Sequence, residues 1–354
     1  MAVIVGAGPA GASTAVALAS LGHPTVMLER ARETADAICG GFLSWRTVER
    51  LGAMGIDVAA LGAPAITRLE LFAGGQRAGA PLIAPARALS RRTLDQALTD
   101  RAQTLGAELR RGVSARQLQE GMLETSDGAQ VGRGEPLVLA TGKHEVRGAR
   151  RAATDRDPTL GVRWRLRPQP AVRALIEGAI ELHMFPGGYA GLVLQEDGSA
   201  NLCAAVRRSA FAAAGSSPAA LLASLAEREP ALAARLDGAE IAGSDTVANV
   251  PYGWVAREAG GVYRVGDQAA VIPSLAGEGV GIAIASGALA AHAIAERQPP
   301  DLFQRQLRQR LSRPVRPASV LWNLAERSAS ARLLVQLMRR MPGLASWAMQ
   351  MTRV

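Results

Sequence analysis

The hydrophobic pattern of this chain switches repeatedly between short apolar runs and helical spacing. Residues 2–5 form an apolar run that leads into a glycine-rich turn and a helical pattern, and the next apolar run, 25–28, ends in Glu29. Residues 64–85 and 158–208 instead alternate apolar and polar side chains around glycine-containing turns. Apolar runs separated by helices predict a parallel sheet, whereas the alternating segments predict strands of a second sheet. We therefore expect an α/β fold.

Helical patterns mark the middle and the end of the chain. Helices are expected at 90–106, with Ser90 as the N-cap, and at 217–237. Near the C-terminus, Pro342-Gly343 divides an apolar stripe into two short helices. The stripe consists of Leu334, Leu337, Met338, Met341, Leu344, Trp347, Ala348 and Met351, flanked by Arg332, Arg339, Arg340 and Arg353. Such a basic amphipathic segment either packs on its own protein or lies on a membrane surface.

The turn after the first apolar run carries a nucleotide-binding motif. Its sequence is Gly6-Ala7-Gly8-Pro9-Ala10-Gly11, followed by a helix, a strand and Glu29. The first glycine permits a tight turn, the second lets the backbone approach a pyrophosphate, and the third lets helix and strand pack closely. The pyrophosphate would lie at the positive end of the helix, and Glu29 would accept from ribose hydroxyls. Because a carboxylate there disfavours a 2′-phosphate, NAD and FAD remain as the alternatives.

A second segment, residues 262–283, favours FAD over NAD. A strand at 262–265 ends in Gly266-Asp267, and a turn rich in Pro and Gly then leads into an Ala-rich helix near Gly279. An aspartate at a strand end can hold a ribityl hydroxyl. Backbone amides at the start of a helix can stabilise the anion of a reduced flavin. An NAD enzyme needs neither feature.

The chain resembles a class of FAD-dependent oxidoreductases that holds aromatic hydroxylases, geranylgeranyl reductases and flavin halogenases. The resemblance covers roughly residues 1–300. Its motifs are the N-terminal glycine motif with Glu29, CGGFLS at 39–44, SRRTLD at 90–95, LATGKHEVRG at 139–148, and GDQAA with PSLAGEG between 266 and 279. It implies an α/β fold with a Rossmann-like FAD-binding domain of the glutathione-reductase type, an interleaved β-sheet substrate domain and C-terminal helices.

The resemblance also implies how the chain divides into domains. The expected FAD-binding domain is discontinuous and comprises 1–63, 86–157 and 245–300. The expected substrate domain comprises 64–85 and 158–244, and 301–354 forms a C-terminal helical segment.

Individual FAD contacts follow from the same resemblance. Arg91 matches an arginine that contacts the flavin or the pyrophosphate in relatives, with Arg92 as a competitor on a solvated helix face. Ala115 aligns loosely with a residue whose backbone binds the adenine. The implied contacts are Gly6, Gly8, Pro9, Ala10, Gly11, Glu29, Arg30, Cys39, Gly40, Gly41, Arg91, Ala115, Ala140, Thr141, Gly142, Gly266, Asp267, Pro273, Gly277, Gly279, Val280 and Gly281.

Several residues are candidates for the substrate pocket, and no catalytic group is assigned. Lys143 is the one lysine among 40 basic residues and lies within ATGKHEVRG, which indicates either a need for an ammonium group or chance. Cys39 is either a pocket wall or redox thiol, or a small buried apolar residue. His183 is either an acid or base, or a hydrogen-bonded structural residue. Further polar candidates are Tyr189, Tyr252 and Trp254.

Two departures from the family pattern shape the functional expectation. Thr141-Gly142 stands where hydroxylases carry Asp-Gly. This difference argues against direct use of NAD(P)H but not against FAD binding. Gly191 replaces the tryptophan of the reductase aromatic motif and leaves space above the flavin for a bulky substrate.

These features favour a monooxygenase-like FAD-dependent oxidoreductase. Its expected electron donor is NAD(P)H, and its expected substrate is apolar or aromatic, such as a polyketide or another secondary metabolite. One alternative is an FAD-dependent reductase or dehydrogenase of lipid-like or prenyl substrates. Another is a non-catalytic flavin-binding partner in a biosynthetic complex.

Composition adds a few limits. The net charge of +9 comes from arginines scattered along the chain without interleaved aromatic residues, which argues against nucleic-acid binding. Basic character also suits a site for two phosphates, an acidic substrate, a carrier protein or a membrane surface. Cys39 and Cys203 form no C-x-x-C pattern, and the four histidines lack metal-ligand spacing. No apolar run is long enough for a transmembrane helix. We expect a cytoplasmic protein, with peripheral membrane or carrier contact and the oligomeric state left open.

Overall fold

The computed structural model describes residues 1–151, 156–341 and 343–354. Its first layer is a five-stranded sheet, sheet A, with strand order β16-β10-β1-β2-β6 and every pairing parallel. The strands are β1 (Ala2–Val5), β2 (Thr25–Glu29), β6 (Glu108–Arg111), β10 (Leu137–Leu139) and β16 (Tyr263–Arg264). Because β1, β2 and β10 are nearly all buried, they read as continuous apolar runs, as expected for a parallel sheet covered by helices.

Eight strands form the second sheet, sheet B, in the order β15-β11-β14-β13-β12-β4-β5-β3. All its pairings are antiparallel except β12 with β4. The strands are β3 (Phe42–Leu43), β4 (Ala65–Ala73), β5 (Gln76–Ala88), β11 (Thr159–Arg167), β12 (Ala179–Phe185), β13 (Gly188–Leu194), β14 (Ala200–Arg207) and β15 (Glu240–Val250). A smaller sheet beside sheet A contains β7 (Ala115–Gln119), β8 (Met122–Thr125) and β9 (Gln130–Val131).

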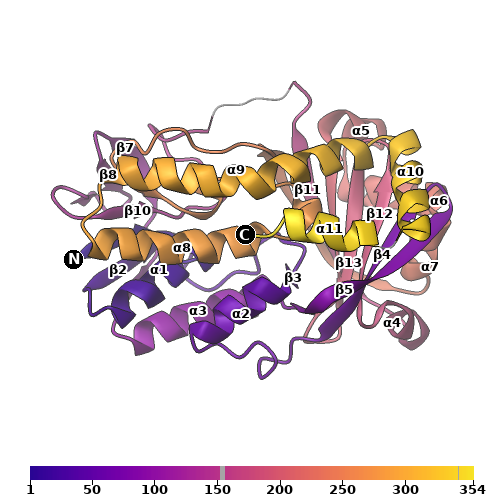
Figure 1. Ribbon diagram of the computed structural model, residues 1–354, viewed down its shortest axis with the longest axis horizontal. Helices are drawn as coiled ribbons and strands as arrows, with labels where there is room; N and C mark the ends of the chain where they lie inside the picture. Colours follow the sequence, from indigo (N-terminus) through magenta and orange to yellow (C-terminus); the bar gives the residue numbers. More distant parts are fainter. Residues whose placement is uncertain (152–155, 342) are drawn as a thin grey trace.

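Helices cover both sheets, and one long helix extends from the region of sheet A to that of sheet B (Figure 1). Around sheet A lie α1 (Pro9–Ser20), α2 (Trp45–Ala53), α3 (Arg91–Thr104) and α8 (Gly279–Ala295). Around sheet B lie α4 (Pro170–Ile176), α5 (Arg208–Ala213), α6 (Pro218–Arg228), α7 (Pro230–Leu236), α10 (Ser328–Arg340) and α11 (Gly343–Met351). The long helix α9 (Pro300–Ala325) contacts β16 near its start and packs on α10 and α11 near its end. Short 3₁₀ turns occupy Gly266–Gln268 and Ser274–Ala276.

The α/β fold predicted from the sequence is confirmed, with refinements at the boundaries. Ser90 caps α3 by accepting from the Thr93 amide at 3.2 Å. The helix expected at 217–237 is two helices, because Pro230 starts a new one. The segment expected to return to the FAD domain at 245 begins inside β15, which pairs with β11 at the edge of sheet B. Part of the expected 86–157 segment, residues 152–155, and Pro342 lie outside the described residues.

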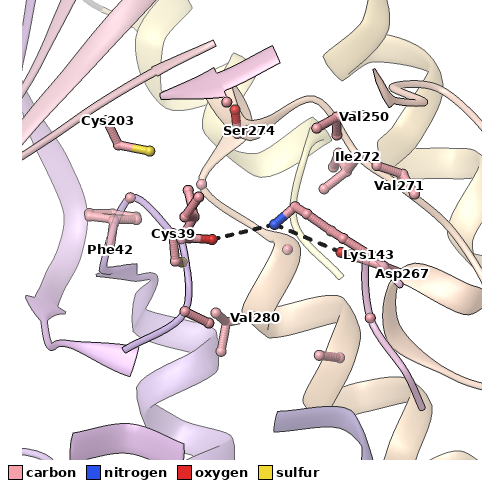
Figure 2. A pocket seen from close by; sticks show the side chains of 18 of the residues that line it. Cys39, Phe42, Lys143, Cys203, Val250, Asp267, Val271, Ile272, Ser274 and Val280 are labelled. Atoms are coloured by element: carbon pink, nitrogen blue, oxygen red, sulfur yellow. Dashed lines mark hydrogen bonds and ion pairs between the residues drawn. The ribbon is translucent and has the colours of Figure 1, made fainter. Parts of the chain in front are cut away.

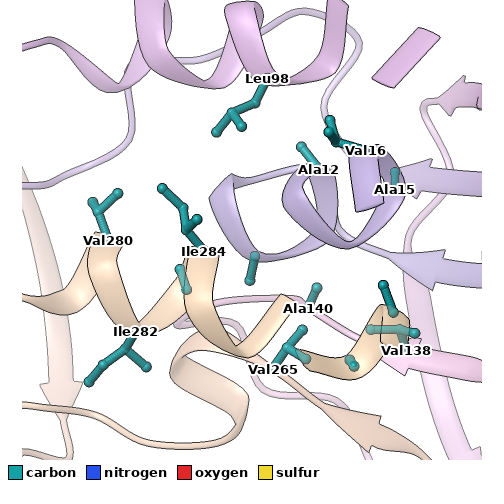
Figure 3. Packing of buried hydrophobic residues seen from close by; sticks show 14 of the residues in the cluster. Ala12, Ala15, Val16, Leu98, Val138, Ala140, Val265, Val280, Ile282 and Ile284 are labelled. Atoms are coloured by element: carbon teal, nitrogen blue, oxygen red, sulfur yellow. The ribbon is translucent and has the colours of Figure 1, made fainter. Parts of the chain in front are cut away.

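The core of the FAD-binding region is the contact between α1 and α8 (Figure 3). A Cβ atom on Gly287 would lie 2.3 Å from Ser13 Oγ and 2.5 Å from the Ala10 carbonyl oxygen. A Cβ on Gly11 would lie 1.8 Å from the Gly6 carbonyl oxygen. Only hydrogen fits at these positions, so glycine brings α1 against both its own turn and α8.

We predict that Gly287→Ala lowers the free energy of unfolding by about 1–3 kcal/mol, because the added methyl group forces α1 and α8 apart. Gly52→Ala in α2 is the matched control, since nothing lies within 4 Å of its Cβ position. That variant should be neutral or stabilising by about 0.5–1 kcal/mol. Urea unfolding measures both. Equal effects of the two substitutions would contradict the packing argument.

Candidate functional site

One cavity of about 1200 Å³ runs from the turn after β1 to the C-terminal helices. Its first end is lined by the glycine motif, Glu29 and Arg91. Its middle is lined by Cys39, Lys143, Asp267 and the turn before α8, and Figure 2 shows this region. Its far end lies between sheet B and the helices α9, α10 and α11.

The turn after β1 has the backbone that a pyrophosphate site requires. Gly6 has φ +104°, and a Cβ there would lie 2.4 Å from the Ala140 carbonyl oxygen. A Cβ on Gly8 would lie 3.3 Å from Arg91 Nη2, so the missing side chain leaves the space between the turn and the guanidinium open. The first amides of α1 therefore face the cavity beside a cationic side chain, which suits two phosphates.

Glu29 is fixed at the end of β2 by two backbone donors. The Ala7 amide donates to Oε2 and the Ala31 amide to Oε1, each at 2.9 Å. The carboxylate lines the cavity next to the start of α1. This is the place and the chemistry for accepting from the ribose of an adenine nucleotide.

Arg91 is held by a buried partner. Its Nε and Nη2 donate to the two oxygens of Asp95 at 2.8 and 2.6 Å. Burial lowers the pKa of this guanidinium, but the adjacent Asp95 raises it by more, so Arg91 stays cationic. Arg92 is exposed, so the structure distinguishes the two neighbours.

At the middle of the cavity, β16 is followed by the tight turn at Gly266, which has φ +58°. The Gly266 amide donates to Ser286 Oγ at 2.9 Å, which fixes this turn against α8. Asp267 then lines the cavity, with Lys143 Nζ 4.0 Å from its Oδ2 and 3.4 Å from the Ile38 carbonyl oxygen (Figure 2). The Lys143 ammonium therefore bridges the Asp267 turn and the loop that carries Cys39.

The C-terminal tail is anchored to the turn that precedes α8. Arg353 Nη1 lies 3.0 Å from Glu278 Oε2, and the guanidinium lies 4.9 Å from the ring centroid of Trp45. Glu278 is fully buried, and burial raises the pKa of its carboxyl. Arg50 also donates to the backbone oxygen of Val354. The last helix is thus tied to Gly277-Glu278-Gly279, the segment expected to face the flavin.

The far end of the cavity is apolar, with one polar cluster. Tyr189 donates to Ser274 Oγ at 2.7 Å, and Tyr252 hydrogen-bonds to the same Ser274 hydroxyl. Burial raises the pKa of both phenols, so both remain neutral hydrogen-bonding groups. Gly191 lies on β13 of sheet B, two residues from Tyr189, and lines the cavity; a Cβ there would make ordinary contact with Leu182 and Tyr189, at 3.5 and 3.7 Å. The apolar wall includes Leu69, Leu71, Leu82, Leu182 and Met184.

The cavity brings together most of the residues expected at the site. Those lining it are Gly6, Gly8, Pro9, Ala10, Glu29, Arg30, Cys39, Gly40, Gly41, Arg91, Ala115, Ala140, Thr141, Gly142, Lys143, Tyr189, Gly266, Asp267, Gly277, Gly279 and Val280. Gly11, Pro273 and Gly281 are buried behind the lining. Gly11 and Gly281 serve close packing there, since a Cβ on Gly281 would lie 2.2 Å from Glu278 Oε1.

The structure does not place His183 in the cavity. Its ring is fully buried in sheet B, where it stacks on Phe72 with centroids 4.5 Å apart. Nε2 lies 3.1 Å from Glu181, which also forms an ion pair with Arg235. Burial lowers the pKa of this imidazole. His183 therefore has the structural role that the sequence left as the alternative.

The other candidate residues also fall into those that line the cavity and those that do not. Tyr252 lines the cavity, whereas Trp254 does not and lies under the Arg151 guanidinium at 6.0 Å. Cys39 lines the cavity, and burial raises the pKa of the nearby Cys203 thiol to about 12. No role was predicted for Ser274 within PSLAGEG, or for α9, α10 and α11 as lining of the cavity, because both depend on long-range packing.

The residues that the structure describes hold no group of three or more His, Cys, Asp or Glu side chains arranged to bind a metal ion. No helix within residues 1–151, 156–341 and 343–354 has the length and hydropathy needed to cross a bilayer.

Comparisons with known proteins agree with this geometry. Residues 1–135 match the family described as FAD binding domain. No curated protein matches the chain in sequence. The fold is similar to that of the flavin-dependent brominase Bmp2, at 17% identity and TM-score 0.76, over 99% of this chain and 92% of that chain.

Two further solved structures share the fold. A geranylgeranyl bacteriochlorophyll reductase-like protein from Thermoplasma acidophilum matches at 18% identity and TM-score 0.78, over 96% of this chain and 91% of that chain. PqsL from Pseudomonas aeruginosa is described as a probable FAD-dependent monooxygenase. It matches at 15% identity and TM-score 0.75, over 95% of this chain and 99% of that chain. The N-terminal family match and this shared fold confirm the predicted resemblance to FAD-dependent oxidoreductases.

We predict that Arg91→Ala weakens FAD binding at least tenfold, about 1.4 kcal/mol, because it removes the cation facing Gly8. The neighbouring Arg92→Ala should change it less than twofold. A titration that follows flavin fluorescence measures both.

Arg91→Ala also leaves Asp95 buried without its partner, so stability needs a control. Adding Asp95→Asn should restore the melting temperature without restoring FAD affinity. Recovery of affinity in the double variant would show that Arg91 acts only by supporting the fold.

Lys143→Arg keeps the charge but replaces a compact ammonium group with a planar guanidinium group. We predict slower flavin reduction or faster loss of FAD on gel filtration, since the longer side chain cannot sit between Asp267 and Ile38 in the same way. Normal reduction kinetics together with normal FAD retention would mean that the lone lysine is incidental.

Proposed function

We propose that this protein is an FAD-dependent monooxygenase acting on an apolar or aromatic substrate. The observation that carries the proposal is the continuity of the cavity: the phosphate-compatible turn at Gly8 and the apolar chamber around Tyr189 belong to one space. A cofactor held at one end would therefore meet a substrate held at the other. Bound FAD supplies the redox chemistry with oxygen, and the protein supplies binding and orientation.

Individual side chains would have distinct tasks in this reaction. Glu29 and Arg91 bind the nucleotide half, and Asp267 accepts from the sugar-like chain. The first amides of α8, which begins at Gly279, favour negative charge on the nearby flavin edge. Arg353 and Glu278 hold that segment in place.

The substrate chamber would select its substrate by shape and would exclude water. Leu182 and Met184 exclude water, and Gly191 leaves room for a flat or bulky ring. The hydroxyls of Tyr189 and Tyr252, joined through Ser274, offer neutral hydrogen bonds to a phenol or carbonyl oxygen of the substrate. Polyketide-like aromatic compounds fit this description.

We infer NAD(P)H as the source of electrons. In the balanced reaction one oxygen atom of O₂ enters the substrate, and the other leaves as water with the hydride from NAD(P)H and one proton from solvent. The structural likeness to a probable FAD-dependent monooxygenase supports the reaction type. A reductase of lipid-like substrates is the second candidate, favoured by the apolar lining that extends to α9, α10 and α11.

The test supplies FAD-loaded protein with NAD(P)H, ¹⁸O₂ and a panel of aromatic and prenyl compounds. We expect one product that carries a single ¹⁸O atom, identified by mass spectrometry. The same panel under anaerobic conditions is the control. A product formed without oxygen and heavier by two hydrogens would favour the reductase. NAD(P)H oxidation with no product from any compound would contradict the substrate class.

A variant tests the chamber directly. Gly191→Trp fills the space above the expected flavin position, so we predict at least a tenfold loss of activity on ring substrates with unchanged FAD binding. Gly52→Ala, on α2 where nothing lies within 4 Å of the Cβ position, should leave activity unchanged. Full activity of Gly191→Trp would place the substrate elsewhere.

A further inference from the structure

Exposed apolar side chains gather on the last three helices. Of the fourteen large apolar side chains exposed in the described part of the chain, eight lie between residues 320 and 351. They are Val320, Leu324, Leu333, Leu337, Met341, Leu344, Trp347 and Met351, and we call them the apolar rim. The helices that carry them, the end of α9 with α10 and α11, lie together over sheet B (Figure 1). A cluster of this kind marks an interaction surface rather than random exposure.

The rim is also the outer end of the cavity. Five of its members, Val320, Leu324, Leu337, Leu344 and Trp347, line the cavity although each is at least 36% exposed, and Trp347 is 59% exposed. The same cavity reaches the Gly277 turn and Asp267. The chamber therefore opens to the outside between α9, α10 and α11 through side chains that are themselves apolar.

Positive charge surrounds this opening without neutralising partners. Exposed arginines on these helices are Arg313, Arg316, Arg327, Arg332, Arg339 and Arg340. None of the six forms an ion pair with any residue that the structure describes. The one acidic residue after position 312 is Glu326, which is bound to Arg207 Nε at 2.6 Å. The surface thus combines an apolar centre with an uncompensated basic border.

We propose that the apolar rim docks on a lipid bilayer with anionic headgroups, and that an apolar substrate enters the cavity from that bilayer. The second half rests on the proposed function, because it takes the cavity as the substrate site. Leucine, methionine and tryptophan side chains would enter the boundary between headgroups and acyl chains, and the arginines would lie against the phosphates.

A bilayer fits this surface better than a rigid protein partner. A folded partner covering Leu337, Leu344 and Trp347 would close the cavity that these residues line, whereas a fluid bilayer leaves it open. Every exposed charged side chain between residues 313 and 341 is an arginine, which matches a uniform anionic surface. The rim lies on helices that end within the fold, so the protein would lie on the membrane rather than span it.

The test is co-sedimentation of FAD-loaded protein with vesicles of equal parts phosphatidylcholine and phosphatidylglycerol, compared with phosphatidylcholine alone. No turnover is needed. We expect binding at least tenfold stronger to the anionic vesicles, weakened by salt. Brominated acyl chains in the same vesicles should quench the fluorescence of Trp347, and Trp347→Phe should remove most of that quenching.

Matched variants separate the rim from general surface effects. Leu333→Ser and Met341→Ser alter exposed rim residues that do not line the cavity, and each should weaken vesicle binding severalfold. Leu175→Ser, equally exposed on α4, should have no effect. The double variant Arg339→Glu with Arg340→Glu should abolish the preference for anionic lipid, whereas Arg133→Glu with Arg228→Glu should retain it.

Several outcomes would overturn the proposal. One is equal or absent binding to both kinds of vesicle. Another is a stable dimer that Leu333→Ser converts to monomer without any vesicle binding, which would make the rim a protein interface. Loss of binding in the Leu175→Ser control would also count against it. Because vesicle binding is measured without a reaction, it can succeed when the oxygen-insertion test fails, and the reverse.

Discussion

The close approach of α1 and α8 is the contact on which the rest of this structure depends. Gly11, Gly287 and Gly266 leave no room for side chains where the first turn, α1 and α8 meet. This packing brings a phosphate-compatible turn at the start of the chain next to Asp267 and the start of α8, more than 250 residues later. The cavity that holds both ends of a long cofactor exists only because these segments touch.

A second constraint acts at the other end of the cavity. The C-terminal tail returns to the FAD-binding region, where Arg353 pairs with the buried Glu278 beside Trp45. The helices that form the substrate wall are therefore attached to the segment that would face the flavin.

Sequence reasoning succeeded where a motif is local. The glycine turn, Glu29, Arg91 and the Gly266-Asp267 turn each depend on a few adjacent residues and line one cavity, and the Ser90 cap begins α3 just before Arg91. The remaining positions are decided by contacts between segments that are distant in sequence. His183 sits on the face of β12 opposite to the cavity beside Glu181, and β15 joins sheet B through register with β11. The wall formed by α9, α10 and α11 could not be foreseen, because an apolar helical stripe does not reveal what it packs against.

The most direct test of this account is an equilibrium titration of the full chain with FAD and, separately, with FMN. The cavity is continuous from Glu29 to Gly277, so the account predicts one FAD per chain and binding of FMN at least a hundredfold weaker, about 2.7 kcal/mol. FMN lacks the adenosine half that Glu29 and the α1 turn would hold. Equal affinity for the two flavins, or no binding of either, would contradict the central claim that the two distant segments form a single FAD site.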